Sequence, residues 1–221
     1  MSREGNPFAT RYTRPGAMAF LFPAGQSAAT LVAQLRGHGW WGEIVGPHGS
    51  GKSTLLAALA PELLAAGRKI VWRQVRGPGV GDGDATAGRA RLPPSRWGPD
   101  EAKEVAAKFA AVTAGSDDWN EATQVVLDGY EQLSWWWRRR VQATVRRCKA
   151  GLLVTTHQPL GLPPLAEMTS SEALAQRIVA GLLADKASAV TPADVTAAYA
   201  RTGGNLRETL FALYDVHQSR K

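Results

Sequence analysis

The chain has 221 residues and a mass of 23.7 kDa, which is long enough to bury a hydrophobic core of its own. Its composition, with 44% hydrophobic and 20% charged residues, excludes both a fibrous repeat and a wholly disordered chain. The only cysteine, Cys148, excludes an internal disulfide, and we expect a cytoplasmic protein. No apolar run reaches the roughly 18 residues that a membrane-spanning helix needs.

The charge balance favours polyanionic partners. Lys and Arg number 26 against 19 Asp and Glu, which gives a formal net charge of +7 and a pI of about 9.9. Most of these cations are arginines, whose planar guanidinium makes paired hydrogen bonds with phosphate or carboxylate groups. The excess of positive charge therefore points towards phosphate without identifying a partner.

The first third of the chain predicts a strand, a loop and a helix behind an N-terminal arm. The arm is rich in turn-forming residues, so we expect it to be extended and to lead into a helix over about 27–36. A short apolar strand is predicted over 43–45. A glycine-rich loop follows over 46–51, and then an Ala- and Leu-rich helix over 52–66, which ends at a glycine.

A long segment that breaks regular structure separates the next two elements. The second strand is predicted over 69–75, and the second helix over 99–114, where Pro99 and Asp100 are start signals. Residues 76–99 between them contain six Gly and four Pro, with almost no apolar side chains. We expect this segment to be poorly ordered.

Strands and helices continue to alternate in the middle of the chain. The run QVVL at 124–127 predicts a third strand that ends at Asp128. A helix is predicted over 132–149, a fourth strand over 151–155 and a short fifth strand near 165–168. This alternation predicts an α/β fold whose mostly parallel sheet is covered by helices on both faces.

The composition becomes helical after Ser170. Three short helices are predicted over 172–184, 191–200 and 205–218, and together they suggest a C-terminal, all-helical lid. The expected domains are an arm with its helix over 1–40, a core over 41–168 that contains the breaker segment, and a lid over 169–221.

The loop after the first strand carries a motif with a specific chemistry. It matches G-x-x-x-x-G-K-[ST], in which glycines let backbone N–H groups surround a phosphate. Lys52 is expected to reach the β- and γ-phosphate oxygens, and the Ser53 hydroxyl to bind Mg²⁺. We therefore predict ATP and Mg²⁺ as ligands. The residues expected to hold the nucleotide are Gly46, Pro47, His48, Gly49, Ser50, Gly51, Lys52, Ser53 and Thr54.

Asp128 is the predicted partner of this loop. A hydrophobic strand that ends in a carboxylate is typical of the Walker B element, which holds Mg²⁺ through its water shell. Alone, the same pattern fits a strand whose end is capped by Asp. The phosphate loop upstream favours the metal role, so Ser53 and Asp128 are the predicted metal residues.

Four segments resemble the P-loop NTPases of the additional-strand group, which includes the AAA+ and STAND ATPases. They are GPHGSGKST at 46–54, VVLDGYE at 125–131, LLVTTH at 152–157 and GGNLRE at 203–208. The resemblance covers the chain from about residue 40 to its C-terminus. It implies a P-loop NTPase core with a helical lid, and in some such proteins the segment before the first strand, here with Phe8, Tyr12 and Arg14, lies near the adenine.

The resemblance also implies residues that sense the γ-phosphate. One is a polar residue after the fourth strand, a role that falls on Thr156 or His157. The other is a lid arginine, matched by Arg207 in Gly204-Asn205-Leu206-Arg207. From the residues alone, His157 is equally a polar loop residue and Arg207 an exposed residue near a helix start. The predicted catalytic residues are Lys52, Asp128, Glu131, His157 and Arg207.

The chain departs from the family pattern at two places. Gly129 follows Asp128, where AAA+ proteins carry the glutamate that polarises water, and Glu131 is the nearby substitute. Glu131 either reaches the water or caps the following helix. The segment over 157–164, where an arginine finger for a neighbouring subunit usually lies, contains no arginine. A standard hexameric motor is therefore disfavoured, while a homo-oligomer stays open.

The helix over 132–149 combines an apolar stripe with arginines. The residues predicted to face the core are Leu133, Trp137, Val141, Thr144 or Val145, and Cys148. Two further rows are expected: Trp135 with Arg139 and Arg146, and Trp136 with Arg140 and Arg147. This surface either contacts nucleic acid, a neighbouring subunit's phosphates or an acidic protein, or is a solvated face in which arginine stems shield tryptophan. The resemblance suggests a polymer-facing role for residues 76–99 too, although a flexible connector fits equally.

Missing motifs narrow the function. The chain has no LSGGQ-like segment of transporter ATPases, no base-reading motif of GTPases and no cysteine–histidine cluster for zinc. The sequence predicts an ATPase whose Mg²⁺-dependent hydrolysis moves the lid or changes partner binding. The alternative is a nucleotide-gated regulatory module with little turnover, acting on a protein or nucleic acid. A small-molecule phosphotransferase is the third reading, and the absent acceptor lid disfavours it.

Overall fold

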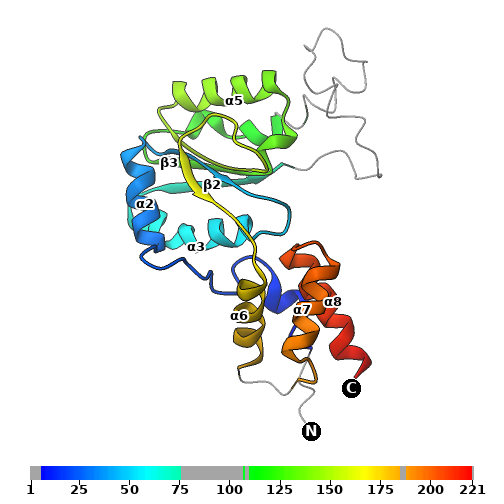
Figure 1. Cartoon of the computed structure of the whole chain (residues 1–221). Helices are drawn as coiled ribbons and strands as arrows, with labels where there is room; N and C mark the ends of the chain where they lie inside the picture. Colours follow the sequence, from blue (N-terminus) through cyan, green and yellow to red (C-terminus); the bar gives the residue numbers. More distant parts are fainter. Residues whose placement is uncertain (1–5, 76–106, 108–109, 185–187, 221) are drawn as a thin grey trace, which may run out of the picture. The chain divides into compact units, whose positions relative to one another are not determined.

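The computed structural model describes residues 6–75, 107, 110–184 and 188–220. Its five strands form one sheet in the order β2-β3-β4-β1-β5 (Figure 1). The pairs β1 with β4, β2 with β3 and β3 with β4 are parallel, which confirms the predicted α/β fold with a parallel sheet. The strands are β1 (Trp41–Val45), β2 (Lys69–Gln74), β3 (Thr123–Asp128), β4 (Gly151–Thr156) and β5 (Pro164–Glu167).

The central strands are apolar because the sheet is covered on both faces. Every residue of β4 is buried, and β3 is buried up to Leu127. Val125, Leu152 and Val154 pack in one cluster with Val141 and other apolar residues of the helix that follows β3. Strands that are buried on both faces have continuous rather than alternating hydrophobic runs, as QVVL and LLV do here.

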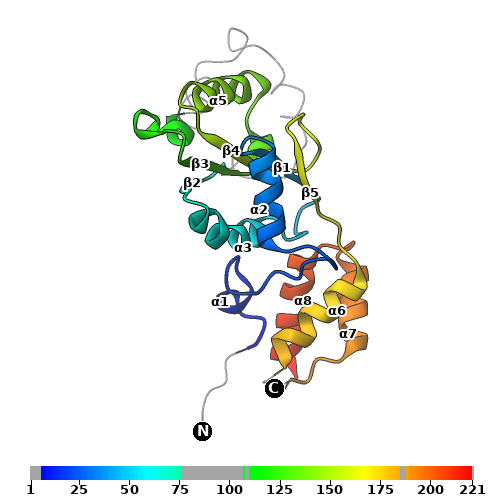
Figure 2. The same cartoon turned by 90° about the vertical axis from the view of Figure 1, so that its left-hand side faces the viewer.

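Helices α2 (Ala28–Gly37) and α5 (Trp135–Arg147) cover opposite faces of the sheet (Figures 1 and 2). The start of α5 corrects the predicted bound of 132. Residues Tyr130–Gln132 form the 3₁₀ turn η4, and Leu133 is extended, with φ −83° and ψ 136°. The α-helix therefore begins only after Ser134, which is its N-cap residue.

The other predicted helices lie close to their expected bounds. Helix α3 spans Lys52–Ala65, and the C-terminal helices are α6 (Glu172–Leu183), α7 (Pro192–Arg201) and α8 (Leu206–Ser219). The side chains of Ser171, Thr191 and Asn205 accept hydrogen bonds from backbone N–H groups in the first turns of α6, α7 and α8. Each of these helices thus starts at an N-cap signal that is visible in the sequence.

The sequence predicted an extended N-terminal arm, but the arm contains a short helix. Residues Thr10–Thr13 form the one-turn helix α1, and Phe8 is fully buried among apolar residues of α6, α7 and α8. The Phe8 ring also contacts His217 edge to face, with 6.2 Å between ring centroids. Phe8 is therefore part of the helical core, and the proximity of the arm to the adenine stays a prediction.

The chain divides into two compact units. One, here called the loop–lid unit, comprises Met1–Ser27, Gly46–Leu59 and Glu167–Lys221. The other, the sheet unit, comprises Ala28–Val45 and Ala60–Ala166. The predicted breaker at 76–99 and the first part of the helix predicted over 99–114 lie outside the described residues, while 110–113 are helical. Within the described ranges, no helix is both long and apolar enough to cross a membrane.

Candidate functional site

The phosphate-type loop lies in the loop–lid unit, between β1 and α3. Lys52 is the first residue of α3 and its side chain is buried, with 9% exposure. Its Nζ atom donates hydrogen bonds to the carbonyl oxygens of Gly46 (2.6 Å) and Pro47 (2.8 Å). The loop is therefore wrapped around its own ammonium group, and the positive charge is held beside the N-terminus of α3, where the helix dipole also favours an anion.

The loop is closely covered by the residue before α8. A β-carbon on Gly49 would lie 1.8 Å from Oδ1 of Asn205, and Gly49 has a left-handed φ of 71°. A side chain there would force Asn205 to move and would be strained by the left-handed backbone. The hydroxyl of Ser50 is buried and, within the part of the chain that the structure describes, makes no hydrogen bond. The buried Lys52 ammonium and the buried Ser50 hydroxyl are the kinds of group that bind an oxyanion, and both lie in this loop.

Asp128 is fixed by its neighbour strand in the sheet unit. The Thr155 hydroxyl of β4 donates to Oδ1 of Asp128 at 2.6 Å, and Oγ1 of Thr155 itself accepts from the Gly129 N–H at 2.9 Å. Thr155 is fully buried. One hydroxyl thus orients the carboxylate and the turn that follows it.

The structure explains why residue 129 is a glycine. Gly129 has a φ of 86°, and a β-carbon on it would lie 2.6 Å from the carbonyl oxygen of Val75. Val75 is held there because its N–H donates to the Asp128 carbonyl at 2.8 Å. No side chain fits at this position without movement of the backbone.

Glu131 and His157 lie together in the sheet unit. His157 Nε2 is 3.3 Å from Glu131 Oε1, and the two side chains are 25% and 19% exposed. Glu131 belongs to η4, and the cap of α5 is Ser134, so the helix-capping interpretation of Glu131 is wrong. Buried Glu43 of β1 accepts a hydrogen bond from Leu160 N–H at 3.0 Å and so anchors the loop that carries His157.

The two candidate sensors after β4 have different surroundings. Thr156 is fully buried, and its hydroxyl makes no hydrogen bond to any described residue. His157 is partly exposed and contacts Glu131. The third candidate, Arg207, is exposed in the first turn of α8 with its guanidinium 5.6 Å from the Phe211 ring.

Sequence reasoning missed the residues that hold the site residues in place. The sequence motifs place Asn205 in a lid turn and Thr155 in a strand, but they do not indicate that these side chains contact other site residues. An N-cap signal does mark Asn205 in the sequence. Nothing in the sequence indicates that Glu43 reaches Leu160, since that contact joins β1 to a loop more than a hundred residues later.

The arginine rows of α5 are partly as predicted. Arg139, Arg140, Arg146 and Arg147 are all exposed, and Val141 and Val145 are buried. Arg139 stacks over Trp135 as expected, at 5.0 Å. Arg140 instead lies over Trp137, at 5.4 Å, and Arg146 over Trp41 of β1, at 4.8 Å. Arg146 departs from its predicted row because it contacts a residue of the sheet, and helical spacing gives no information on contacts outside the helix.

Solved structures resemble this chain in fold, whereas comparisons of its sequence find no match. No protein-family model matches the chain, and no curated protein matches it in sequence. The Orc1 protein of Aeropyrum pernix, solved in complex with DNA, is similar over 96% of this chain and 65% of its own, with 14% identity and a TM-score of 0.59. This chain thus spans slightly less than two thirds of the Orc1 chain.

A second solved structure, PCH-2 of C. elegans, aligns over 87% of this chain and 67% of its own, with 12% identity and a TM-score of 0.38. The Orc1 similarity covers nearly the whole chain, and the parallel sheet and the three C-terminal helices match what the sequence predicted. This protein therefore has a parallel α/β fold with C-terminal helices that is similar to the fold of Orc1 over nearly its whole length.

Proposed function

We propose that this protein binds ATP with Mg²⁺ in the loop over Gly46–Ser53 and hydrolyses it. The observation that carries the proposal is the placement of Lys52, a buried ammonium held by two carbonyl oxygens of a loop that begins directly after a parallel strand. A buried cation at a helix N-terminus favours a polyanionic ligand. The buried Ser50 hydroxyl and the left-handed backbone of Gly49, which turns the loop, support the same ligand.

Each loop residue has a task in this proposal. The backbone N–H groups from Gly49 to Thr54 bind phosphate oxygens, Lys52 pairs with the terminal phosphates, and Pro47 and His48 shape the turn. The Ser53 hydroxyl and Asp128 hold the metal, with Thr155 keeping the carboxylate oriented. A bound Mg²⁺ supplies charge neutralisation for the β- and γ-phosphate oxygens.

Glu131 is the proposed base that orients the attacking water. It is the carboxylate nearest in sequence to Asp128, and His157 holds it at 3.3 Å. A partner at that distance limits the rotation of the carboxylate and thereby fixes the direction in which it accepts a proton. Thr156 or His157 and Arg207 are the proposed sensors of the γ-phosphate, and the helices over 169–221 are the proposed lid whose movement follows hydrolysis.

The binding site is tested by titrating a fluorescent ATP analogue with Mg²⁺ against Lys52→Ala. The matched control is Lys149→Ala, which removes a lysine that is 74% exposed and pairs with Glu121 at the surface. We expect affinity to fall at least 100-fold in Lys52→Ala and to stay unchanged in the control. Binding of wild-type strength in Lys52→Ala would overturn the site assignment.

A second candidate function is a nucleotide-gated module with little turnover. The crowding of Gly129 by the Val75 carbonyl favours it, because this site lacks a glutamate directly after Asp128. Phosphate release measured at steady state separates the two functions. A loss of 100-fold or more in Glu131→Gln supports hydrolysis. Equal release by wild type and Glu131→Gln leaves only the gated module.

The proposal also includes a macromolecular partner for the ATPase cycle. Orc1 was solved in complex with DNA, and the exposed arginines of α5 support a nucleic-acid partner for this chain as well. A homo-oligomer is tested by measuring the mass of the particle with and without a nonhydrolysable ATP analogue. Under the oligomer proposal the mass rises when the analogue is bound.

A further inference from the structure

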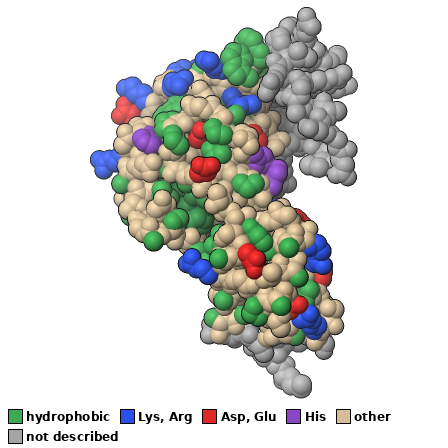
Figure 3. Space-filling model, viewed as in Figure 1, with side chains coloured by type: hydrophobic (Ala, Val, Ile, Leu, Met, Phe, Trp, Pro, Cys, Tyr) green, Lys and Arg blue, Asp and Glu red, His purple; other side chains and the backbone are tan. Residues whose placement is uncertain are grey.

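Helix α5 begins with two exposed tryptophans. Trp135 is 47% and Trp136 is 41% exposed, and their rings meet edge to face at 4.9 Å with an interplanar angle of 86°. Indoles are large apolar groups, and two of them side by side in solvent are the usual mark of a binding surface. In Figure 3, Lys and Arg side chains gather next to hydrophobic side chains over α5.

The same helix is strongly basic. Its 13 residues, WWWRRRVQATVRR, include five arginines and no acidic residue. Of these, Arg139 stacks over Trp135 and Arg146 over Trp41. Within the ranges that the structure describes, no carboxylate lies at ion-pair distance from Arg139, Arg146 or Arg147. We call Trp135, Trp136, Arg139, Arg140, Arg146 and Arg147 the Trp–Arg surface.

The surface has the dimensions of a short strand of polymer. With 3.6 residues per turn, Trp135, Arg139 and Arg146 form one row along the helix, and Trp136, Arg140 and Arg147 form the next. From the indoles to the last guanidiniums the helix rises about 16 Å. Aromatic faces thus lie at one end of the surface, and positive charge continues along it.

The combination of exposed indole rings and guanidiniums favours some polyanionic ligands over others. A single-stranded nucleic acid has exposed bases that stack on indole rings and phosphates that pair with guanidiniums. A duplex keeps its bases stacked inside, so it would use the arginines and leave the indoles unused. An acidic peptide likewise pairs with arginine and offers the indoles no aromatic partner.

We propose that the Trp–Arg surface of α5 binds single-stranded DNA or RNA, with bases stacked on Trp135 and Trp136 and the backbone held by the arginines. The proposal does not depend on ATP binding, because α5 lies wholly in the sheet unit and none of the loop residues belongs to it. It adds a polymer site to a chain whose other predicted site takes a nucleotide.

The experiment is fluorescence anisotropy of labelled 20-nucleotide oligo(dT) and oligo(U), with a duplex of the same length as the comparison, titrated with the full chain at several salt concentrations. We expect the single strands to bind at least 10-fold more tightly than the duplex. Stacking of one base on an aromatic side chain is worth about 5-fold or more in affinity. Trp135→Ala with Trp136→Ala removes two such rings and should therefore weaken single-strand binding at least 10-fold.

The arginine variants have a different expected signature. Arg139→Gln with Arg147→Gln should weaken binding and flatten the dependence of log affinity on log salt by about 0.7 for each lost phosphate contact. The tryptophan pair should leave that slope unchanged, because stacking releases no counterions. The matched control is Tyr214→Ala with Arg201→Gln, which removes an exposed aromatic and an exposed arginine from the C-terminal helices.

Several results would overturn the proposal. Two concern the ligand: equal binding of duplex and single strand, or tighter binding of a labelled poly-Glu peptide than of oligo(dT). Two concern the variant Trp135→Ala with Trp136→Ala: unchanged binding of oligo(dT), or conversion of a dimer to a monomer. Thermal unfolding checks that each variant is folded, and Trp135→Phe with Trp136→Phe, which keeps two aromatic rings, should retain most of the binding. Lys52→Ala should bind oligo(dT) like the wild type, so the polymer site and the nucleotide site are judged separately.

Discussion

The amide oxygen of Asn205 occupies the space that any side chain on Gly49 would need. The distance from that oxygen to a β-carbon built on Gly49 is 1.8 Å. The same oxygen accepts a hydrogen bond from the Glu208 N–H at 3.2 Å and so caps α8. One side chain therefore links the conformation of the phosphate-type loop to the start of the last helix.

This link predicts a specific cost for Gly49→Ala. The new methyl forces Asn205 to move, which removes a helix cap worth about 1 kcal/mol, and the left-handed backbone adds about 1 kcal/mol. We expect the free energy of unfolding, measured with urea, to fall by about 2 kcal/mol. Gly25→Ala is the matched control, because Gly25 has a similar φ of 78° with no atom within 4 Å of the added carbon.

The overlap itself is tested by a second substitution. In the Gly49→Ala background, Asn205→Ala should cost less than it does in the wild type, since the cap is already displaced. Equal losses for Gly49→Ala and Gly25→Ala would mean that Asn205 yields without cost.

The hydroxyl of Thr155 predicts a metal-dependent defect. Thr155→Val leaves the Gly129 N–H and the Asp128 carboxylate without a buried hydroxyl, which should cost about 1 to 3 kcal/mol in urea unfolding. It should also weaken Mg²⁺-dependent nucleotide binding by about 10-fold, because the carboxylate is no longer oriented. Thr155→Ser keeps the hydroxyl and should retain the Mg²⁺ dependence. A metal affinity that is the same in the Val and Ser variants contradicts the positioning role.

Glu131 and His157 should act as a pair in turnover. If His157 works by orienting Glu131, then His157→Ala lowers kcat in the wild-type background and has little further effect in Glu131→Gln. Steady-state phosphate release for the four proteins of this double-mutant cycle gives the coupling. Two independent, multiplicative losses would mean that the histidine acts on its own.

Tyr130 predicts a loss of stability at high pH. Burial raises the pKa of Tyr130 from 10.0 to about 12. Above pH 10 the unfolded chain ionises this phenol while the folded chain keeps it neutral, so stability falls between pH 10 and 12 by up to about 3 kcal/mol. Below pH 10 the contribution is fully present.

Tyr130→Phe should lack this alkaline decline. At pH 8 it should be less stable by about 1 kcal/mol, because the phenol donates to the Arg138 carbonyl and accepts from Gln142, both at 3.2 Å. The control is Tyr214→Phe, whose side chain is 37% exposed. Parallel stability curves for wild type and Tyr130→Phe between pH 8 and 12 would refute the assignment.

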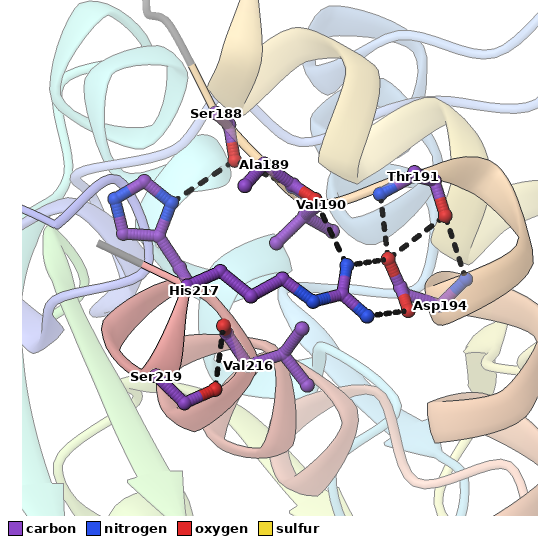
Figure 4. Close-up of polar contacts among 9 residues, drawn as sticks. Ser188, Ala189, Val190, Thr191, Asp194, Val216, His217 and Ser219 are labelled. Carbon is purple, nitrogen blue, oxygen red and sulfur yellow. Dashed lines mark hydrogen bonds and ion pairs between the residues drawn. The ribbon is translucent and has the colours of Figure 1, made fainter.

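Asp194 predicts an acid-sensitive C-terminal region. Its carboxylate accepts hydrogen bonds from Arg220, at 2.6 and 2.8 Å, and from the Thr191 N–H and hydroxyl, both at 2.8 Å; Figure 4 shows Thr191 and Asp194 with their contacts. The hydrogen bond with Arg220, followed by those with Thr191, holds the pKa of Asp194 well below its usual value of 3.8. Its contribution is present above that value and is lost as the pH falls below it.

Hydrogen exchange of α7 and α8 measures this contribution. Asp194→Asn should increase exchange at pH 7, and the difference from wild type should shrink as the pH falls below about 4. Asp215→Asn, an exposed carboxylate of α8, is the matched control and should exchange like the wild type. A difference that does not shrink at all between pH 4 and pH 2 would assign the effect to something other than the charge of Asp194.

Much of the fold follows from local sequence signals. The runs QVVL and LLV are too apolar for an exposed strand, and Thr191, with a proline after it and Asp194 three residues on, marks a helix start in any context. The glycine loop, Lys52 and the strand ending at Asp128 could be identified for the same reason, since each depends on residues that are close together in the chain. The start of α5 was misplaced because the turn at Gly129 consumes residues that have helical spacing.

The sequence by itself determined the alternation of strands and helices, the glycine loop and the basic, aromatic character of α5. Only the tertiary structure decided that Thr155 holds Asp128, that Glu131 faces His157, that Asn205 covers Gly49 and that Val75 excludes a side chain from residue 129. The physical reason is range. Hydrophobic periodicity and caps are properties of a few neighbouring residues, whereas these contacts depend on the pairing of strands and the packing of helices, which bring distant side chains within a few ångströms of each other.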